Sequence, residues 1–456
     1  MKACAVILAA GAGTRMKSKK PKVAHEMLGK PLVQWVVDAA HKADIDHLIT
    51  VVGHEREQVI PLVENDSTIV VQEQLKGTAD AVMSCRETLR DFDGSLLVLS
   101  GDCPLISPET IRTLVAVCEK QQAAVVVLTM MADNPFGYGR IVRDKKGMIE
   151  RIVEQKDCDE EQALIAECNS GFYCFDAQTL FKALDKVNNK NAQGEYYLTD
   201  VIEIAREAGQ PVIGVKASNE AECLGINSRE QLALATRYAQ KQINSRLMDE
   251  GVGMCDPHLV WIGPDAMVER DVEILPMTFL YGKTSIGEDS IIGPNSRLID
   301  TIVGRGCIVD ETIAIEARID DGASCGPRAY LRPEAHLCRN AKAGTHVEIK
   351  KSTIGEGSKV PHLSYVGDTT IGKNTNLGAG TITCNYDGKN KYHTEIGNEV
   401  FVGSDTMLVA PVSLGDGSLV GAGSVITEDV SADALALARG RQVEIPKWKE
   451  RKKSQG

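Results

Sequence analysis

The chain has 456 residues, of which 43% are hydrophobic, 25% are charged and only 4% are aromatic. This composition is typical of a globular protein, and the length predicts two or three domains rather than one. The formal charge is 51 − 63 = −12 and the pI is about 5.4, which argues against broad nucleic-acid binding but permits a local basic pocket for an anionic small molecule.

The cysteines and the N-terminal residues indicate the cellular compartment in which the protein works. Thirteen cysteines are scattered without a CxxC pair, a pattern typical of neither a disulfide framework nor a zinc site, so we expect core residues in a reducing cytosol. No apolar run approaches the roughly 18 residues that cross a membrane. Lys2 and the apolar run after it imitate a signal peptide, but TRMKSKK makes a poor cleavage site. We therefore predict a cytoplasmic protein without membrane insertion.

Up to about residue 227, short apolar runs alternate with helical patterns. Buried parallel strands are predicted for AVILAA (5–10), HLITVVG (47–53), SLLVLSGD (95–102) and AVVVLTM (124–130). A helix should begin at Pro108 with Ser107 as its N-cap. Residues 140–154 read as a hairpin that turns at 144–147, so the sheet should be mixed. The pattern predicts an α/β domain over 1–227 with the layering of nucleotide-binding proteins.

A single long helix is predicted for residues 228–250, because this stretch contains no glycine or proline before Gly251. A helix of about 22 residues would span roughly 33 Å. Such a helix would suit a rigid connector between two bodies.

From residue 251 to 456 the aliphatic residues recur every six positions. The first run is Ile262, Val268, Ile274, Leu280, Ile286, Ile292 and Leu298, and a later one is Ile396, Val402, Leu408, Leu414, Val420 and Ile426. Neither a helix nor an amphipathic strand has this period, whereas a triangular parallel β-helix does. CNYDGKNKYHTE (384–395) interrupts the repeat and should leave the coil as a loop, where function tends to lie.

Gly11-Ala-Gly13-Thr14-Arg15 follows a predicted strand and precedes a helix. It is neither a Walker loop nor a Rossmann fingerprint. Glycines would let backbone N–H groups approach a phosphate, and Arg15 and Lys22 would add positive charge. A strand-to-helix turn with solvated lysines fits the spacing equally well.

Two further residues are candidates for chemistry. Asp102 ends the strand SLLVL, and a carboxylate at the carboxyl end of such a strand is a reasonable Mg²⁺ ligand, although an unpaired surface aspartate gives the same pattern. His362 lies in PHLSYVGD, about 20 residues before the segment 384–395 that interrupts the repeat. It could act as a base near pH 7, while a structural role is commoner for a lone histidine.

The basic tail KWKERKK (447–453) reads as a solvated end or as a contact for an anionic cofactor.

The motifs together resemble a known family. LAAGAGTRMKSKKPK is similar to the signature LAAGxGTRM…PK of sugar-1-phosphate nucleotidyltransferases. With SGDCPL, FGYGR, IVEQKD, NAQGEYYLTD, HLSYVGD and GAGTITCNYDG, residues 3–440 closely resemble the bacterial bifunctional N-acetylglucosamine-1-phosphate uridyltransferase/glucosamine-1-phosphate acetyltransferases. The resemblance implies an α/β nucleotidyltransferase domain with a Rossmann-like mixed sheet, a linker helix and a left-handed parallel β-helix. It also implies a homotrimer with sites between subunits; the six-residue period gives neither the handedness nor the trimer.

For the N-terminal half, the resemblance implies Mg²⁺-dependent uridylyl transfer from UTP to N-acetylglucosamine 1-phosphate, with release of pyrophosphate. The product, UDP-N-acetylglucosamine, would supply peptidoglycan and lipopolysaccharide synthesis. The implied residues are Leu8, Ala9, Ala10 and Gly11 for uracil and ribose, Gln72, Gly77 and Thr78 for the base, Arg15 and Lys22 for the triphosphate, Asp102 and Asn227 for Mg²⁺, and Gly139, Glu154 and Asn169 for the sugar.

For the C-terminal half, the resemblance implies acetyl transfer from acetyl-CoA to the amine of glucosamine 1-phosphate. The implied residues are His362 as the base, Arg332 and Lys350 for the phosphate, Tyr365 and Asn376 for the sugar, and Ala379, Asn385, Tyr386, Ser404, Ala422 and Arg439 for acetyl-CoA. A backbone N–H near Ala379 would serve as an oxyanion donor.

The sequence departs from the family pattern at three places. Ala12 stands where lysine is frequent, Ser100 replaces a common tyrosine, and Thr345-His346 stand where Asn-Phe is usual.

Two alternative families resemble parts of the chain. A monofunctional pyrophosphorylase with a regulatory β-helix would have no use for His362 or Tyr365, and a non-catalytic exchange-factor subunit would not need Asp102. The roles of residues 191–200 and of the basic tail stay open.

Overall fold

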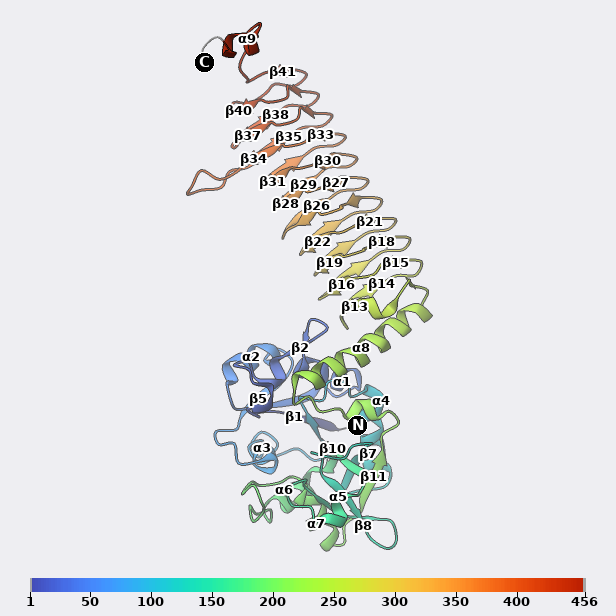
Figure 1. Ribbon diagram of the computed structural model, residues 1–456. Helices are drawn as coiled ribbons and strands as arrows, with labels where there is room; N and C mark the ends of the chain where they lie inside the picture. The colour runs from blue at the N-terminus through green and yellow to red at the C-terminus, as the bar shows by residue number, and fades with distance from the viewer. Residues whose placement is uncertain (1, 454–456) are drawn as a thin grey trace. The chain divides into compact units, whose positions relative to one another are not determined.

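The structure is a computed structural model that describes residues 2–453. It divides into two compact units, Met1–Ala239 and Gln240–Gly456. The division falls inside helix α8 (Arg229–Asp249), which Figure 1 shows as one unbroken helix. The long helix expected over 228–250 is therefore confirmed, while the three-part division into 1–227, 228–250 and 251–456 stays a prediction.

The first unit is built on a mixed sheet of nine strands. Seven of them follow the order β11-β7-β10-β6-β1-β4-β5, and β8 and β9 extend the sheet from β10. The strands are β1 (Ala3–Ala9), β4 (His47–Val52), β5 (Thr68–Val71), β6 (Ser95–Ser100), β7 (Val125–Met131), β8 (Arg140–Arg143), β9 (Ile149–Val153), β10 (Glu167–Asp176) and β11 (Val212–Lys216), with a separate ribbon of β2 (Glu26–Met27) and β3 (Lys30–Pro31).

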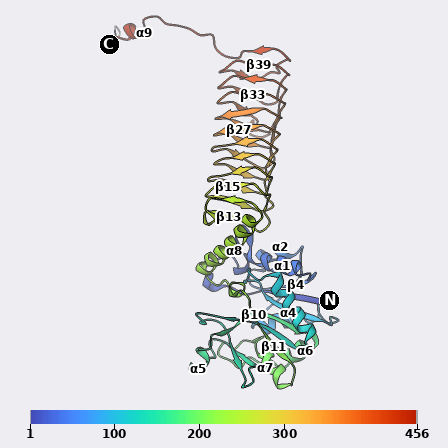
Figure 2. The same ribbon diagram turned by 90° about the vertical axis from the view of Figure 1, so that its right-hand side faces the viewer.

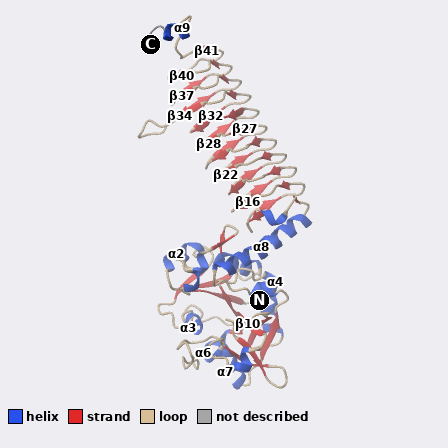
Figure 3. Ribbon diagram, in the orientation of Figure 1, coloured by secondary structure: helices blue, strands red, loops and turns tan. Residues whose placement is uncertain are grey.

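Helices cover this sheet, as Figure 3 shows in blue. They are α1 (Leu32–Lys42), α2 (Arg56–Val63), α3 (Thr78–Met83), α4 (Pro108–Lys120), α5 (Glu160–Ala163), α6 (Ala177–Leu184) and α7 (Asp200–Glu207), with 3₁₀ turns at Thr14–Met16, Lys22–Ala24 and Glu220–Cys223. Helix α4 begins as predicted, because the hydroxyl of Ser107 accepts a hydrogen bond from the N–H of Thr110 at 3.1 Å.

Strand β1 is the central element of the unit. It pairs in parallel with both β4 and β6, and its residues Cys4 to Ile7 are fully buried. The apolar run that imitates a signal peptide is thus a core strand. The antiparallel pairing of β10 with β6 and β7 makes the sheet mixed, as predicted. The hairpin of β8 and β9 is also confirmed, and it closes with Gly147 N–H donating to the carbonyl of Asp144 at 2.9 Å.

The second unit is a parallel β-helix whose coils contribute strands to three parallel sheets, the arrangement expected of a left-handed β-helix with hexapeptide repeats. Figure 2 shows its coils one above the other from β13 to β39. The 3₁₀ turn Pro257–Leu259 lies in the first coil, and the short helix α9 (Trp448–Lys453) lies in the basic tail.

The first sheet has eleven strands: β12 (Gly253–Met254), β15 (Glu273–Ile274), β18 (Ile291–Ile292), β21 (Ile308–Val309), β24 (Ser324–Cys325), β27 (Lys342–Thr345), β30 (Lys359–His362), β33 (Asn376–Leu377), β36 (Phe401–Val402), β39 (Leu419–Val420) and β41 (Leu435–Ala436).

The second sheet has ten strands: β13 (Val260–Ile262), β16 (Thr278–Tyr281), β19 (Arg297–Ile299), β22 (Ile313–Ile315), β25 (Tyr330–Leu331), β28 (Glu348–Lys350), β31 (Tyr365–Gly367), β34 (Ile382–Cys384), β37 (Met407–Val409) and β40 (Val425–Ile426). The third has nine: β14 (Met267–Val268), β17 (Ser285–Ile286), β20 (Ile302–Val303), β23 (Arg318–Ile319), β26 (Ala335–Leu337), β29 (Ser352–Ile354), β32 (Thr369–Ile371), β35 (Thr394–Ile396) and β38 (Val412–Leu414).

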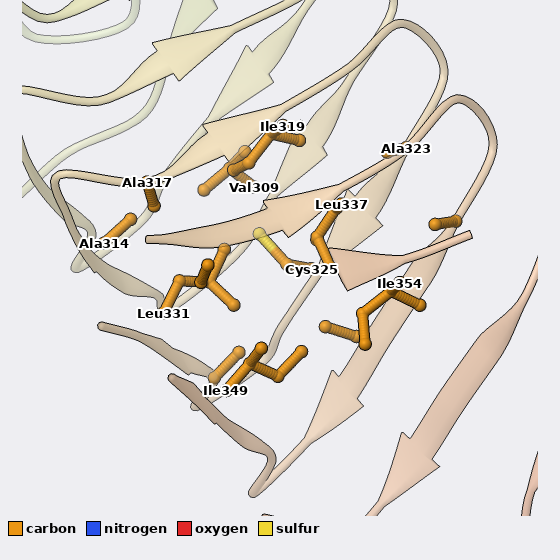
Figure 4. Close-up of a cluster of buried hydrophobic side chains, with 14 of the residues drawn as sticks. Val309, Ala314, Ala317, Ile319, Ala323, Cys325, Leu331, Leu337, Ile349 and Ile354 are labelled. Carbon is orange, nitrogen blue, oxygen red and sulfur yellow. The ribbon is translucent and has the colours of Figure 1, made fainter. Parts of the chain in front are cut away.

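The six-residue repeat corresponds to the interior of this β-helix. Every aliphatic residue of the two predicted runs is at most 4% exposed, apart from Val268 in the first coil, which is only partly buried. Figure 4 shows the same pattern farther along, where Ile319, Leu331, Leu337 and Ile349 gather inside the coils. Each aliphatic side chain packs on those of the neighbouring coils, so a polar substitution at any of these positions would leave a polar group buried in the core.

Residues 385–393 leave the coil between β34 and β35, within the segment 384–395 where the repeat is broken. They form a hairpin that projects from the stack near β34 in Figure 1, with an antiparallel bridge between Tyr386 and Lys391. No helix among residues 2–453 is long and apolar enough to cross a bilayer.

Candidate functional sites

The first unit contains a cavity of about 450 Å³ at one edge of its sheet. Because β1, β4, β5 and β6 are parallel, their carboxyl ends meet at this edge, and the segments that follow them converge there. The cavity is lined by eight of the residues that the sequence singled out, namely Leu8, Ala10, Gly11, Lys22, Gln72, Gly77, Thr78 and Asp102. Ala9 and Arg15 are not among the lining residues, since Ala9 is buried and Arg15 is exposed.

Lys22, Asp102 and Asn227 meet at this cavity although up to 205 residues separate them. The ammonium of Lys22 donates to the carboxylate of Asp102 and, at 2.9 Å, to Oδ1 of Asn227. The side chains of Lys22 and Asp102 are only 15% and 18% exposed, so their charges are weakly screened. A carboxylate and an amide oxygen that converge on one cation are the hard donors that Mg²⁺ prefers, so the pair fits the predicted metal site.

The loop between β5 and α3 is held rigidly at the same cavity. The buried amide of Gln72 donates to the carbonyl of Gly77 at 3.1 Å and to Asp80 at 2.7 Å. The hydroxyl of Thr78 accepts from the N–H of Leu198 at 3.0 Å, and the carbonyl of Tyr196 accepts from Ala79 at 2.9 Å. Residues 191–200, whose role the sequence left open, therefore brace this loop, and Glu195 from the same segment lines the cavity.

Substitution of Gly77 tests how tightly the loop is braced. Gly77 has φ 116° and ψ 179°, and a Cβ there would lie 2.5 Å from the carbonyl oxygen of Tyr196 and 2.8 Å from its nitrogen. We expect Gly77→Ala to lower the free energy of unfolding by roughly 1–3 kcal/mol and to raise KM for UTP several-fold. Denaturant unfolding and steady-state kinetics measure the two effects.

Gly209→Ala is the matched control for this prediction. Gly209 also has a positive φ of 70°, but nothing lies within 4 Å of its Cβ position. The control should lose about 1–2 kcal/mol from backbone strain and keep its KM. If Gly77→Ala leaves KM for UTP unchanged, the loop does not shape the nucleotide site.

The three residues predicted for the sugar also lie together. Asn169 N–H donates to the carbonyl of Gly139 at 2.8 Å, and a Cβ on Gly139 would lie 3.5 Å from Cβ of Asn169 and 3.6 Å from Oε1 of Glu154. The hydroxyl of Thr199 donates to Oε1 of Glu154 at 3.2 Å. Burial raises the pKa of Glu154, and the nearby carboxylates of Asp157 and Asp200 raise it further.

A second cavity, of about 730 Å³, is lined in part by Glu154 and is larger than the first. Its lining carries the carboxylates of Glu154, Asp157, Asp200, Glu203 and Glu207. Burial, followed by repulsion from Glu203 and Asp157, raises the pKa of Asp200 to about 6. These five carboxylates outnumber the three cations of the same lining, Arg151, Lys186 and Lys190, and the excess negative charge opposes a triphosphate. The smaller cavity beside Lys22 is therefore the better nucleotide site.

In the second unit, four of the six residues predicted for acetyl-CoA, namely Ala379, Ser404, Ala422 and Arg439, form a row along one corner of the β-helix. Main-chain hydrogen bonds connect consecutive coils there: Leu363 N–H to Thr345 O (3.0 Å), Gly380 N–H to His362 O (3.4 Å), Asp405 N–H to Ala379 O (2.7 Å) and Gly423 N–H to Ser404 O (2.9 Å). The guanidinium of Arg439 adds a bond to the carbonyl of Ala422 at 2.7 Å. From His362 to Arg439 the row passes four coil spacings, about 19 Å at roughly 4.8 Å each, which suits an extended ligand.

His362 stands at one end of this row. It is the last residue of β30, its side chain is exposed, and Thr345 lies beside it in register on β27. The departure at Thr345-His346 therefore borders His362. Leu363 has φ 47°, so the chain turns sharply between His362 and Tyr365 on β31 and places them on either side of one corner.

A group of cations lies on the adjoining face. Arg332 follows β25 and Lys350 ends β28, and these strands are paired in register. The pKa of Lys350 is lowered chiefly by the ammonium of Lys391, which the excursion hairpin brings beside it, and also by Arg332. Arg332 is oriented by a hydrogen bond to Glu348 at 2.8 Å. Crowded cations of this kind favour an anion between them, which supports the predicted phosphate contacts.

Lys391 is the residue that the sequence analysis missed. The only signal was its place in the interrupted segment 384–395, because its distance of 41 residues from Lys350 in the chain hides their proximity.

The hairpin also positions Asn385 and Tyr386. Asn385 is 6% exposed, and its amide donates to Asp368 at 2.5 Å. A Cβ on Gly367 would lie 2.5 Å from Oη of Tyr365 and 2.8 Å from Nδ2 of Asn385, so these two side chains converge over Gly367. Tyr386 is 60% exposed on the hairpin. Asn376 lies on β33 in register with Lys359 and Phe401 rather than with His362.

Family models match both units. The model of the MobA-like NTP transferase domain matches residues 5–172. In the β-helix, the model of the bacterial transferase hexapeptide (six repeats) matches residues 393–428, and that of the hexapeptide repeat of succinyl-transferase matches residues 283–315.

Curated relatives extend over nearly the full chain. Proteins named bifunctional protein GlmU are 47% identical in Desulfitobacterium hafniense over 98% of this chain and 99% of theirs, and 47% identical in Caldanaerobacter subterraneus and in a Geobacillus species over 99% of this chain and 98% of theirs. A solved UDP-glucose pyrophosphorylase in complex with UDP-glucose aligns with 53% of this chain at 20% identity and a TM-score of 0.43, a likeness too weak to bear on either fold or function.

The relatives share both the order of the domains and almost the whole length of the chain. An NTP transferase domain followed by a hexapeptide-repeat domain is the arrangement that the structure contains. The chain therefore belongs to the GlmU family of bifunctional enzymes, in which one polypeptide carries a uridyltransferase and an acetyltransferase activity.

Proposed function

We propose that the chain makes UDP-N-acetylglucosamine in two steps at two separate sites. The second unit would transfer the acetyl group of acetyl-CoA to glucosamine 1-phosphate. The first unit would then join N-acetylglucosamine 1-phosphate to the uridylyl group of UTP. The observation that carries the proposal is that one chain holds both sets of residues, with Lys22, Asp102 and Asn227 in contact and with His362 at the end of the row that leads to Arg439.

At the first site, the phosphate oxygen of the sugar would attack the α-phosphorus of UTP in line, and pyrophosphate would leave. No protein nucleophile is needed, so the protein contributes position and charge. Gln72, Gly77 and Thr78 would orient the base, Lys22 and Arg15 would neutralise the phosphates, and Gly139, Glu154 and Asn169 would hold the sugar. Mg²⁺ held by Asp102 and Asn227 would stabilise the negative charge of the phosphates.

At the second site, the amine of glucosamine 1-phosphate would attack the carbonyl carbon of acetyl-CoA. His362 would take the proton from the attacking nitrogen, and the C–S bond would break to release CoA. Arg332, Lys350 and Lys391 would hold the phosphate of the sugar, with Tyr365 and Asn376 at the sugar ring. The pantetheine chain would run along the corner row past Ala379, Ser404 and Ala422, with Asn385 and Tyr386 at its side.

The proposal extends to assembly and compartment. A homotrimer through the β-helix would allow a neighbouring subunit to complete the acetyltransferase site, in which His362 is exposed. A cytoplasmic location is supported by the thirteen free cysteines, most of them buried, because free thiols persist in a reducing compartment.

One assay tests the whole proposal. The purified chain is given glucosamine 1-phosphate, acetyl-CoA, UTP and Mg²⁺, and UDP-N-acetylglucosamine, CoA and pyrophosphate are measured. All three should appear, and omission of acetyl-CoA should stop pyrophosphate release unless N-acetylglucosamine 1-phosphate is added. Pyrophosphate release from glucosamine 1-phosphate without acetylation would contradict the proposed order of the two steps.

A further inference from the structure

Three potential metal ligands converge on the outer face of the β-helix, away from the corner row. Within residues 2–453, Asp320, His336 and Cys338 form the one group of three His, Cys, Asp or Glu donors whose ligand atoms all lie within 4.8 Å of one another. Nε2 of His336 lies 2.8 Å from Oδ2 of Asp320 and 4.0 Å from Sγ of Cys338. Neither proposed reaction uses any of these three side chains.

The fold places them together through the coil register. β23 and β26 are neighbours in one sheet, with Arg318 opposite His336 and Ile319 opposite Leu337. Asp320 and Cys338 follow these two strands directly, so they occupy equivalent places on adjacent coils, and His336 projects outward between two buried residues. His336 thus lies on a regular strand, and Asp320 and Cys338 each lie one residue beyond the end of a paired strand, so the coil register holds all three positions.

The donor spacing is close to what a tetrahedral ion needs. Zinc bonds of about 2.0–2.3 Å at tetrahedral angles place neighbouring donors about 3.4–3.6 Å apart. The separations of 2.8 and 4.0 Å from His336 bracket this value, so small side-chain rotations would satisfy it. Asp320 and His336 are 27% and 31% exposed, which leaves room for water as a fourth ligand.

A neighbouring side chain orients one of the three ligands. Nε of Arg318 donates to Oδ1 of Asp320 at 2.8 Å, which fixes the carboxylate and leaves Oδ2 directed at His336. One carboxylate and one thiolate would balance the charge of a divalent ion. The mixture of imidazole, thiolate and carboxylate suits a borderline ion such as Zn²⁺ rather than Mg²⁺, which prefers oxygen alone.

We propose that Asp320, His336 and Cys338 form a Zn²⁺-binding site that clamps two adjacent coils of the β-helix. Binding would join the end of β23 to β26 through three ligands. The ion would then stabilise the folded second unit by mass action, since the ligands come together only when the coils are stacked.

Zinc retention and a cobalt spectrum test the proposal. The full chain is stripped with a chelator, reloaded with Zn²⁺ and dialysed, and the bound metal is counted. In parallel, Co²⁺ is titrated in, because a thiolate ligand gives a charge-transfer band that oxygen ligands do not give. We expect one Zn²⁺ per chain, a thiolate–Co²⁺ band that Zn²⁺ abolishes, and an unfolding midpoint several degrees higher with Zn²⁺.

Variants identify the ligands. Cys338→Ser, His336→Gln and Asp320→Asn should each weaken Zn²⁺ binding at least tenfold, and Cys338→Ser should also remove the Co²⁺ band. Cys255→Ser and His258→Ala are matched controls, because both residues are exposed in the same unit, and Asp102→Asn checks the oxygen site that lies next to Cys103. The proposal is overturned if the wild-type chain retains no zinc, or if the band survives in Cys338→Ser and disappears in a control.

Discussion

His362→Ala should lower the rate of acetyl transfer by about 10²–10⁴-fold, the usual contribution of a general base. Uridylyl transfer should stay within a factor of two of the wild type, because His362 lies in the second unit and the nucleotide cavity lies in the first. CoA release with glucosamine 1-phosphate measures the first activity. Pyrophosphate release with N-acetylglucosamine 1-phosphate measures the second.

The control for this experiment is His258→Ala. His258 is also exposed on the β-helix, but it lies in the first coil, far along the stack from the row at His362. His258→Ala should keep both activities. If His362→Ala retains acetyl transfer, or if both activities fall together in a folded protein, His362 is not the base of a separate acetyltransferase site.

Asp102→Asn should have the reverse effect. The substitution keeps the size of the side chain but removes the negative charge that faces Lys22, and an amide binds Mg²⁺ far more weakly than a carboxylate. We expect uridylyl transfer to fall by about two to three orders of magnitude, which corresponds to about 3–4 kcal/mol of transition-state stabilisation. Acetyl transfer should be unchanged. Pyrophosphate release across a Mg²⁺ titration is the measurement.

Asp66→Asn is a suitable control, since Asp66 is exposed in the same unit and away from the lining of the cavity. The Mg²⁺ dependence adds a second readout. A substitution that only misplaces the substrate would lower the rate at every Mg²⁺ concentration. Loss of a metal ligand should instead raise the Mg²⁺ concentration that gives half of the maximal rate. Unchanged Mg²⁺ dependence in Asp102→Asn would remove Asp102 from the metal site.

The sequence predicted the β-helix well because its signal is local. The coil places one aliphatic residue inward at each face, so the six-residue period appears directly in the chain, and Ile274, Ile292 and Leu414 are buried as expected. Val268 is the exception, since it lies in the first coil, where fewer neighbouring coils cover it. Strand β1 was equally predictable, because an entirely apolar run suits a strand buried on both faces.

Contacts between residues that are distant in the chain were harder to predict from the sequence. No pattern in the chain indicates that Tyr196 braces the loop at Gly77 or that Lys391 lies beside Lys350. The sequence named Asp102 and Asn227 as a pair only through the family resemblance, and the structure adds that Lys22 bridges them. The role of Arg15 at the phosphates stays a prediction, since its side chain is exposed and is not among the residues that line the cavity.

The sequence by itself determined the two kinds of fold, the long helix at Arg229–Asp249 and the family. Each of these rests on periodicity or on motifs of adjacent residues, which a linear chain displays directly. The tertiary structure alone decided which side chains meet: the cation bridge at Asp102, the brace on the nucleotide loop, the cluster at Lys391 and the donors at His336. The reason is physical, since parallel strands and stacked coils bring residues tens to hundreds of positions apart into register, and that register depends on packing of the whole unit.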